Sequence, residues 1–300
     1  MNLRFVEAFV WVARLKSITR GAEKLFLTQS AVSSRIAALE EELGTQLLDR
    51  RHPGFRLSDA GTRFLVYADR LLALQSELKN ELGTPEEHPF SLRIGAIESV
   101  LHTWLIPMVD QLKKIVPKIE FELSIETTPL LNEQIKRGAL DLVFSAIPAT
   151  GEGILSEAMP PLEMVLVGPE RMAGDTPLTV EAILGHELMT FQRGSQPHIA
   201  LTSALRNAGA SGKRVHSISS VSALVRLVDS GFGLATLPRA VTEQLRQRNG
   251  ICVLASALKL DPLPVFASYW SDPAAPVLKQ AVTAALAIAK DYNCGAAATA

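Results

Sequence analysis

The sequence contains only two cysteines, Cys252 and Cys294, and no Cys-x-x-Cys pair. A zinc site or a redox motif built on paired cysteines is therefore not expected, and two unpaired thiols are typical of a reducing cytosol. Long hydrophobic runs are also missing, since no window holds the roughly 18 apolar residues that a membrane-spanning helix requires. Glu7 interrupts the only apolar run near the start, which excludes a typical signal peptide. We therefore expect a soluble, cytoplasmic protein without a membrane partner.

Motifs of catalysis are likewise missing. The sequence contains no Gly-x-Ser-x-Gly elbow, phosphate-binding loop, dinucleotide glycine pattern or His-Glu-x-x-His zinc motif. The six histidines are scattered along the chain. We therefore expect a protein that is not an enzyme and needs no metal or cofactor. An α/β enzyme, or a solute-binding protein fused to a helical bundle, stays open as the alternative.

Composition and charge give weaker guidance. Hydrophobic residues make up 47% and charged residues 20% of the 300 positions, which is ordinary for a globular protein of two or three domains. The net charge of −1 hides an uneven distribution. Residues 1–57 hold nine Arg and Lys against six Asp and Glu, whereas residues 58–88 hold three against six. A basic N-terminal domain is compatible with nucleic-acid binding, although mixed charge is more often a solvated surface.

The first 27 residues predict two helices and a turn. Apolar residues at helical spacing predict a first helix over about residues 3–15: Phe5, Phe9, Val12 and Ala13. Ser17 or Thr19 can cap a second helix. Three of its side chains are expected to face inward: Ala22, Leu25 and Phe26. Leu27 then forms the turn that leads to a third helix.

The third helix begins after the cap Thr28 and ends at Gly44, and its two faces differ. One face is apolar: Val32, Ile36, Leu39 and Leu43. The other face carries hydrogen-bonding side chains near the N-terminal end: Gln29, Ser30, Ser33, Ser34 and Arg35. Gln can pair with adenine and Arg with guanine, and a helix N-terminus attracts phosphate. We therefore expect Thr28 and this polar face to bind double-stranded DNA.

Residues 47–57 predict a basic hairpin. A short strand at 47–50 is followed by the turn Pro53-Gly54 and by a returning strand at 55–57. Three side chains of the hairpin could reach phosphates or a minor groove: Arg50, Arg51 and His52. Three helices with such a hairpin form a winged helix-turn-helix over residues 1–58. Helical spacing alone would equally fit a small three-helix bundle.

One dense set of residues matches a known family pattern. It comprises Phe9–Ala13, Ser17–Leu25, Leu27–Ser33, Ile36, Leu39-Glu40, Leu43-Gly44, Leu47-Leu48, Arg50 and Leu57–Gly61. This pattern resembles the LysR-type transcriptional regulators, and the resemblance implies that the early face of the third helix enters a major groove. The family often has Pro in place of Ser30 and Arg in place of Ser34. Arg35 lies about 100° further round the helix, so its contact with a base or a phosphate stays open.

A long helix is predicted to follow, over residues 59–83. Ser58 can cap it, and Gln75 interrupts a heptad-like apolar seam. The seam consists of Phe64, Ala68, Leu71, Leu78 and Leu82. A helix this long cannot cover such a seam by itself, so we expect it to form a homodimer, or part of a homotetramer, as the resemblance also implies. Pairing two DNA-reading domains about 34–36 Å apart is the usual route to specificity. Residues 84–90 are expected to form a hinge.

The remaining two hundred residues alternate between strands and helices, which predicts mainly parallel sheets covered by helices. The resemblance implies a two-lobed fold like that of type 2 periplasmic binding proteins. Residues 91–162 and 266–291 would form lobe 1, residues 163–265 lobe 2, and residues 292–300 a flexible tail. A solute-binding protein would explain this half of the chain. It would not explain the polar face of the third helix.

Ligands of open α/β sheets bind beyond the carboxyl ends of the strands. Seven residues at such positions are candidate effector ligands: Ser99, Thr127, Thr128, Ser145, Arg193, Ser219 and Ser220. Each hydroxyl could also be an ordinary helix cap. Arg193 would favour an anion such as a small carboxylate and Glu98 would oppose one, so the charge of the effector stays open.

The sequence therefore predicts a sequence-specific, DNA-binding transcriptional regulator that a small molecule controls from between the two lobes. RNA polymerase is a further candidate partner. The operator, the regulated genes, the identity of the effector and the choice between activation and repression are not encoded in any motif of the chain.

Overall fold

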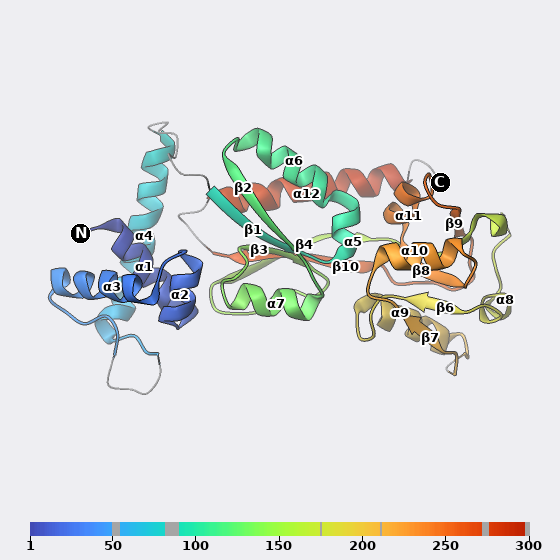
Figure 1. Cartoon of the computed structure of the whole chain (residues 1–300), viewed down its shortest axis with the longest axis horizontal. Coiled ribbons are helices and arrows are strands. Elements are labelled where there is room, and N and C mark those ends of the chain that lie inside the picture. The colour runs from blue at the N-terminus through green and yellow to red at the C-terminus, as the bar shows by residue number, and fades with distance from the viewer. Residues whose placement is uncertain (50–54, 82–89, 175, 211, 272–275, 298–300) are drawn as a thin grey trace.

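A computed structural model describes residues 1–49, 55–81, 90–174, 176–210, 212–271 and 276–297. Figure 1 shows three bodies in a row: an N-terminal helical domain, a first α/β lobe and a second α/β lobe. Lobe 1 lies between the other two. The long helix at 59–81 leaves the helical domain on one side.

The helical domain has the three helices that the sequence predicts. They are α1 (Leu3–Leu15), α2 (Ile18–Lys24) and α3 (Gln29–Leu43). The caps are also as predicted, because the side chains of Ser17 and Thr28 each accept a hydrogen bond from the first turn of their helix. Gly44 ends α3 with a φ of 64°, a conformation that glycine adopts without strain.

Two of the apolar side chains expected inside this domain lie at its surface. Phe26 is 69% exposed, because its φ of 54° turns the side chain away from the α2–α3 core. Leu43 is 37% exposed, because the last turn of α3 extends beyond the helices that cover Val32 and Ile36. The predicted inward orientation was wrong for both residues.

Helix α4 (Asp59–Glu81) begins where the sequence places the linker helix, and the Oγ of Ser58 accepts from the amide of Gly61 at 2.9 Å. Its first half packs on its own domain. Ala68 is fully buried there, and the ring of Phe64 lies 5.4 Å from that of Phe9. These two positions of the predicted dimer seam therefore contact the same chain. Leu82 lies outside the described residues.

The sheet of lobe 1 has the order β2-β1-β3-β10-β4. Its strands are β1 (Phe90–Ala96), β2 (Ile119–Ile125), β3 (Leu142–Ser145), β4 (Ile154–Leu162) and β10 (Leu263–Trp270). β1 is parallel to β2 and β3, but β10 is antiparallel to β3 and β4. β4 therefore runs in the same direction as β1, β2 and β3, and the expectation of a mainly parallel sheet fails only at β10. The chain leaves lobe 1 after β4 and returns along β10, and an antiparallel pair needs no crossover helix.

The helices of lobe 1 cover both faces of this sheet. α6 (Ile106–Ile115) and α12 (Pro276–Ala297) lie on one face, and α7 (Thr128–Lys136) lies on the other (Figure 1). Because α12 continues to Ala297, residues 292–297 are helical, which corrects the prediction of a flexible tail from residue 292. β10 already begins at Leu263, ahead of the predicted return at residue 266.

The sheet of lobe 2 has the order β7-β6-β8-β5-β9. Its strands are β5 (Met164–Pro169), β6 (Leu188–Thr190), β7 (Val215–Ser217), β8 (Leu234–Pro238) and β9 (Ile251–Leu254). Its helices are α8 (Val180–Leu184), α9 (Gln196–Asn207), α10 (Val221–Asp229), α11 (Arg239–Leu245) and a short 3₁₀ turn (Glu170–Met172). As in lobe 1, four strands run in one direction and a single strand, here β5, runs against them.

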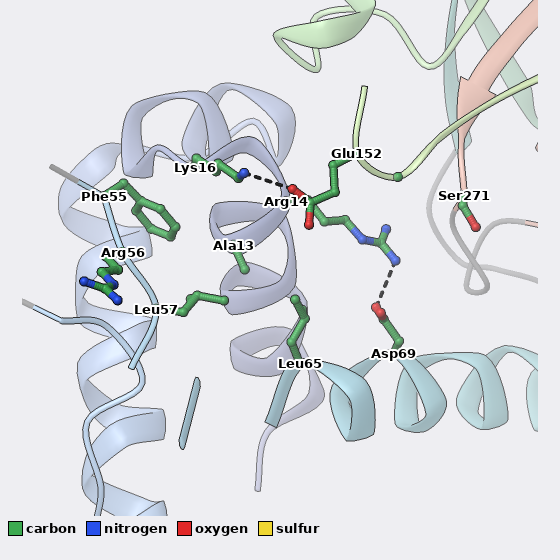
Figure 2. Close-up of a pocket in the computed structure, with 11 residues that line it drawn as sticks. Ala13, Arg14, Lys16, Phe55, Arg56, Leu57, Leu65, Asp69, Glu152 and Ser271 are labelled. Atoms are coloured by element: carbon green, nitrogen blue, oxygen red, sulfur yellow. Dashed lines mark hydrogen bonds and ion pairs between the residues drawn. The ribbon is translucent and has the colours of Figure 1, made fainter. Parts of the chain in front are cut away.

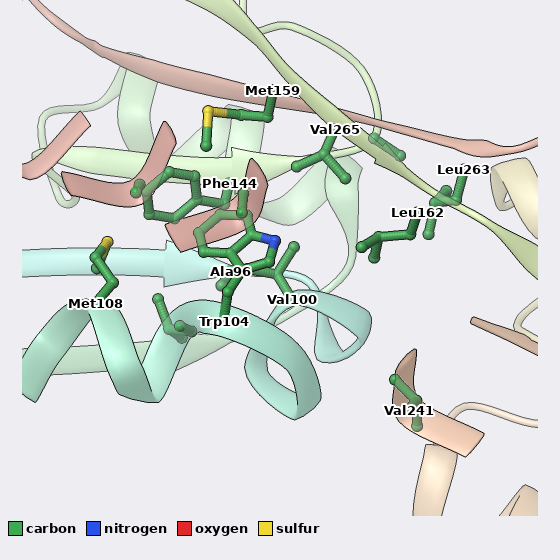
Figure 3. Close-up of a cluster of buried hydrophobic side chains, with 14 of the residues drawn as sticks. Ala96, Val100, Trp104, Met108, Phe144, Met159, Leu162, Val241, Leu263 and Val265 are labelled. Atoms are coloured by element: carbon green, nitrogen blue, oxygen red, sulfur yellow. The ribbon is translucent and has the colours of Figure 1, made fainter. Parts of the chain in front are cut away.

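The helix after β1 is continuous, although Pro107 predicts a possible break. α5 (Glu98–Val100) passes into a π-helical turn (Leu101–Leu105) and then into α6. Pro107 is the second residue of α6, which directly follows the π-helical turn. Trp104 is fully buried beneath this turn, with its ring edge-on to Phe144 at 4.8 Å (Figure 3). The same apolar core continues into lobe 2, so the two lobes share it.

Candidate nucleic-acid interface and effector cleft

The early face of α3 is exposed, as DNA binding requires. Thr28, Gln29, Ser30, Ser33 and Ser34 are all exposed, whereas Arg35 is half-buried. Three side chains of the opposite face anchor the helix in the domain core with at most 1% exposure: Val32, Ile36 and Leu39. The helix therefore presents an uncharged tip of hydroxyl and amide groups to the outside.

Local hydrogen bonds orient this tip. The Oγ1 of Thr28 accepts from the amide of Ala31 at 3.2 Å and lies 3.0 Å from the Oγ of Ser30. The side-chain amide of Gln29 donates to the Oγ1 of Thr19, which belongs to α2. Thr19 does not cap α2, so its contribution is to hold Gln29, a role that no sequence pattern indicates.

The acidic residues of α3 lie away from the tip. Glu40 is buried, and its Oε1 accepts from the amides of Leu47 at 2.8 Å and Leu48 at 3.0 Å. It therefore ties the hairpin strand to α3. Glu41 and Glu42 are exposed, but they lie at the C-terminal end of the helix. The first turn of α3 contains no acid, so its amide groups and partial positive charge can attract phosphate.

The hairpin is described only at its base. An antiparallel bridge joins Leu48 and Leu57, and the amide of Asp49 donates to the carbonyl of Arg56 at 2.8 Å. Arg50, Arg51 and His52, the predicted contacts of the wing, lie outside the described residues.

The candidate effector residues of lobe 1 follow adjacent parallel strands. Because β1, β2 and β3 pair in one sheet, their carboxyl ends meet at the same edge. Ser99 is buried just after β1, and the Oγ1 of Thr128 accepts from the amide of Ala146 at 3.2 Å. Thr127 occupies the cap position of α7 without a side-chain cap bond.

Ser145 is fully buried at the end of β3. Its hydroxyl donates to the carbonyl of Ile147 at 2.8 Å and lies 3.3 Å from the Oδ1 of Asn132. These contacts hold Ser145 within lobe 1, and its role in effector binding stays a prediction.

A contact between the lobes involves two of the residues that the sequence singles out. Ser220 occupies the cap position of α10 without a side-chain cap bond. Its hydroxyl instead donates to the Oε1 of Glu98, across the lobe boundary, at 3.3 Å. His102 lies 3.6 Å from the same carboxylate oxygen. Glu98 thus makes a polar contact between the two lobes, a role that its charge alone does not indicate.

Ser219 and Arg193 of lobe 2 are exposed. Arg193 precedes α9, where partial burial and the Arg193 charge lower the pKa of His198. The described residues include no helix long and apolar enough to cross a membrane. They also contain no cluster of three or more His, Cys, Asp or Glu arranged for a metal ion.

Comparisons with protein families match both halves of the chain. Residues 3–62 match the bacterial regulatory helix-turn-helix protein, lysR family. Residues 86–288 match the LysR substrate binding domain. Among curated relatives, the regulator YofA of Bacillus subtilis is 25% identical over 83% of this chain and 85% of its own. The regulator DgdR of Burkholderia cepacia is 28% identical over 88% and 85%.

Solved structures show the same fold. A full-length OxyR variant from Pseudomonas aeruginosa matches with a TM-score of 0.60 and 18% identity, over 97% of this chain and 95% of its own. Full-length CbnR in complex with its target DNA matches with a TM-score of 0.55 and 20% identity, over 95% and 99%. The arrangement of a helical domain, a long helix and two lobes is common to all three chains.

Proposed function

Since the chain belongs to the LysR family of DNA-binding transcriptional regulators, we propose that α3 reads a specific operator under the control of a small molecule held between the lobes. The family is regulatory and not enzymatic, so the alternative of an α/β enzyme is wrong. A bare solute-binding protein is excluded as well, because residues 3–62 match the helix-turn-helix domain. The exposed, uncharged tip of α3 carries the proposal.

The tip has the chemistry for base recognition. Gln29 can make two hydrogen bonds to adenine, and Ser33 is short enough to let the helix backbone approach the groove. The α3 N-terminus adds a phosphate contact that is independent of sequence. CbnR has been solved with its target DNA, which supports the same docking for a chain of this fold.

The exposed side of α4 is the proposed dimer face. Tyr67, Leu74 and Leu78 are 62%, 63% and 54% exposed, and their spacing of seven and four places them on one side of the helix. This stripe takes the place of Phe64 and Ala68 in the predicted dimer seam. Sedimentation of the intact protein would separate a homodimer from a homotetramer, and Leu74→Glu should shift either one toward the monomer.

The proposed effector site lies beside the Glu98–Ser220 contact and includes Ser99 and Thr128 of lobe 1 and Ser220 of lobe 2. Glu98 contributes a carboxylate there, so a ligand that offers a hydrogen-bond donor or a cation at that point would bind best. Such a ligand would replace the Glu98–Ser220 contact and shift the balance between lobe arrangements, provided it binds them unequally. A thermal-shift screen of small metabolites, repeated with Glu98→Gln, would identify it.

Selection from a random duplex library is the decisive experiment for DNA binding. The intact protein should enrich a site with two related half-sites at low salt, and the selected duplex should shift in a gel. A protein that neither enriches a sequence nor shifts any duplex at low salt would contradict the proposal.

A further inference from the structure

Helix α1 is buried on two faces, and its own domain covers only one of them. Val6, Phe9 and Val12 pack into the core that α1 shares with α3 and α4. Trp11 and Leu15, which are 5% and 4% exposed, belong to a different apolar cluster. Its six other buried members all come from lobe 1: Leu131, Ile135, Leu140, Val143, Ala149 and Trp270. The N-terminal domain therefore packs directly against lobe 1.

The contact is specific in its geometry. The rings of Trp11 and Trp270 meet edge to face, with centroids 6.0 Å apart and planes at 80°. The indole nitrogen of Trp270 donates to the carbonyl of Ile135 at 2.9 Å, which fixes that ring within lobe 1. Leu15 lies over Gly138, where any side chain larger than hydrogen would collide with it. This close fit is typical of a built interface.

Charges cross the same boundary. Lys24 of α2 pairs with Asp141 of lobe 1, and all three side chains of the Lys24–Asp141–Arg93 network are at most 13% exposed. Arg93 reaches Asp141 at 2.9 Å through its guanidinium and also through its backbone amide. The Lys24 ammonium lies 4.5 Å from the Trp11 ring centroid. Burial alone would raise the pKa of Asp141, but Lys24 and Arg93 outweigh it and hold that pKa below its usual value.

The edge of the contact is polar and open. Lys16 pairs with Glu152 at 2.9 Å, and a pocket of about 460 Å³ lies beside them between the two bodies (Figure 2). Arg14 pairs with Asp69 of α4 at 2.9 Å on the same rim. The interface thus has a buried centre of apolar side chains and one ion-pair network, and an exposed polar rim, which is usual for a protein–protein contact.

We propose that this surface is an intramolecular clamp, which fixes the DNA-binding domain to lobe 1 of the same chain and passes movements of lobe 1 to α3. The clamp consists of Trp11, Leu15 and Lys24 on one side and of Trp270, Gly138 and Asp141 on the other. The reading face of α3 stays exposed in the clamped state, so the clamp sets the orientation of the reader without covering it. A change in the orientation of lobe 1 therefore changes the orientation of α3 directly, in addition to any change transmitted through α4.

Cysteine cross-linking tests the contact without DNA. Lys16→Cys with Glu152→Cys, in a chain whose Cys252 and Cys294 are replaced by Ser, should form an intrachain product with a short bismaleimide. The matched control is Lys16→Cys with Lys259→Cys, whose second site is exposed in lobe 2 and should give no such product. A product of doubled mass in the first pair would show that the surface binds a second copy, which would overturn the clamp.

Leu15→Glu tests what holds the contact, because Leu15 lies outside the domain's own core. A buried carboxylate at this point should lower the intrachain yield by about tenfold or more. It should also shift Trp11 and Trp270 fluorescence to longer wavelength. Leu155→Glu, at a half-exposed position of lobe 1, should change neither readout. An unchanged yield with Leu15→Glu would overturn the assignment.

A DNA-binding measurement tests whether the clamp orients α3, and it is made separately from the cross-linking that tests the contact itself. This step rests on the proposed function, whereas cross-linking does not. With the clamp released, two readers are no longer pre-oriented, so affinity for a selected duplex with two half-sites should fall about tenfold. Affinity for one half-site should stay the same. Equal affinity of Leu15→Glu and the parent protein for the full site would show that the clamp passes nothing to the reader.

Discussion

Helices α1 and α3 belong to the same small domain, yet they bury different numbers of faces. α3 keeps one side in the core and leaves hydroxyl and amide groups outside. α1 is apolar from Ala8 to Ala13 and buried on every side of this stretch, since Trp11 and Leu15 are covered by lobe 1. A helix that is apolar all round must be buried all round. α3 can therefore meet an external partner, whereas α1 already packs against two parts of its own chain.

The largest effect should come from the face of α1 that serves its own domain. Phe9 is fully buried and contacts Phe64, so Phe9→Ala leaves a cavity that should destabilise the domain by about 3 to 5 kcal/mol. Urea unfolding followed by circular dichroism measures this loss. Phe26→Ala is the control, because that ring is 69% exposed, and its stability should change little. Equal losses of stability for the two variants would contradict the assignment of Phe9 to the core of the domain and of Phe26 to its surface.

The next largest effect should come from the ion-pair network between the N-terminal domain and lobe 1. Asp141→Asn leaves the buried Arg93 guanidinium without its carboxylate, which should cost about 3 kcal/mol of stability at neutral pH. The pKa of Asp141 is lowered in the folded protein, so its contribution is complete above the unfolded value near 3.8. That contribution is lost as pH falls through the lower folded value.

Acid titration of stability checks this sign. The parent protein should lose stability steeply below about pH 4, and part of that slope should be missing in Asp141→Asn. Glu152→Gln is a suitable control, because Glu152 is exposed and its partner Lys16 is exposed as well. Identical acid slopes in the parent and in Asp141→Asn would mean that Lys24 and Arg93 do not hold this carboxylate in its charged form.

The open face of α3 should affect recognition and leave stability intact. Gln29→Ala and Ser33→Ala should each lower discrimination at one base position by about 1 to 3 kcal/mol. Glu41→Ala, at the far end of the same helix, is the matched control. Binding of selected and scrambled duplexes at one salt concentration measures the difference. If Gln29→Ala weakens both duplexes equally, Gln29 does not read a base.

The wing should contribute affinity that is independent of sequence. Arg51→Ala removes one candidate phosphate contact, so it should weaken binding to all duplexes and reduce the salt slope by about one. The measurement is a series of binding constants across salt concentrations. A change confined to the selected duplex would assign Arg51 to base recognition in place of the backbone.

The helical domain was largely predictable from sequence, because its information is local. Caps such as Ser17 and Thr28 and the stop at Gly44 act within one or two turns of the chain. The alternation of the second half likewise predicted sheets covered by helices, and the resemblance supplied their division into two lobes, which the two sheets of the structure show.

What escaped prediction depends on residues far apart in the chain. Trp11 meets Trp270, Lys24 meets Asp141 and Ser220 meets Glu98, and periodicity cannot report such pairings. Ala68 has correct heptad spacing, yet which helix covers it is a tertiary choice. The antiparallel β4–β10 pair was missed for the same reason, since it forms only when the chain returns from lobe 2.

The smallest effect should come from the rim of the α1 contact. Lys16 and Glu152 form an ion pair, but their side chains are 65% and 83% exposed, and exposed pairs contribute between zero and about 1 kcal/mol. Lys16→Ala should therefore leave the intensity and wavelength of Trp11 and Trp270 fluorescence unchanged, whereas Leu15→Ala, one residue earlier, should shift both. High salt should likewise have little effect on the fluorescence of the parent protein. A Lys16→Ala variant that behaves like Leu15→Ala would mean that charge, and not apolar packing, holds α1 to lobe 1.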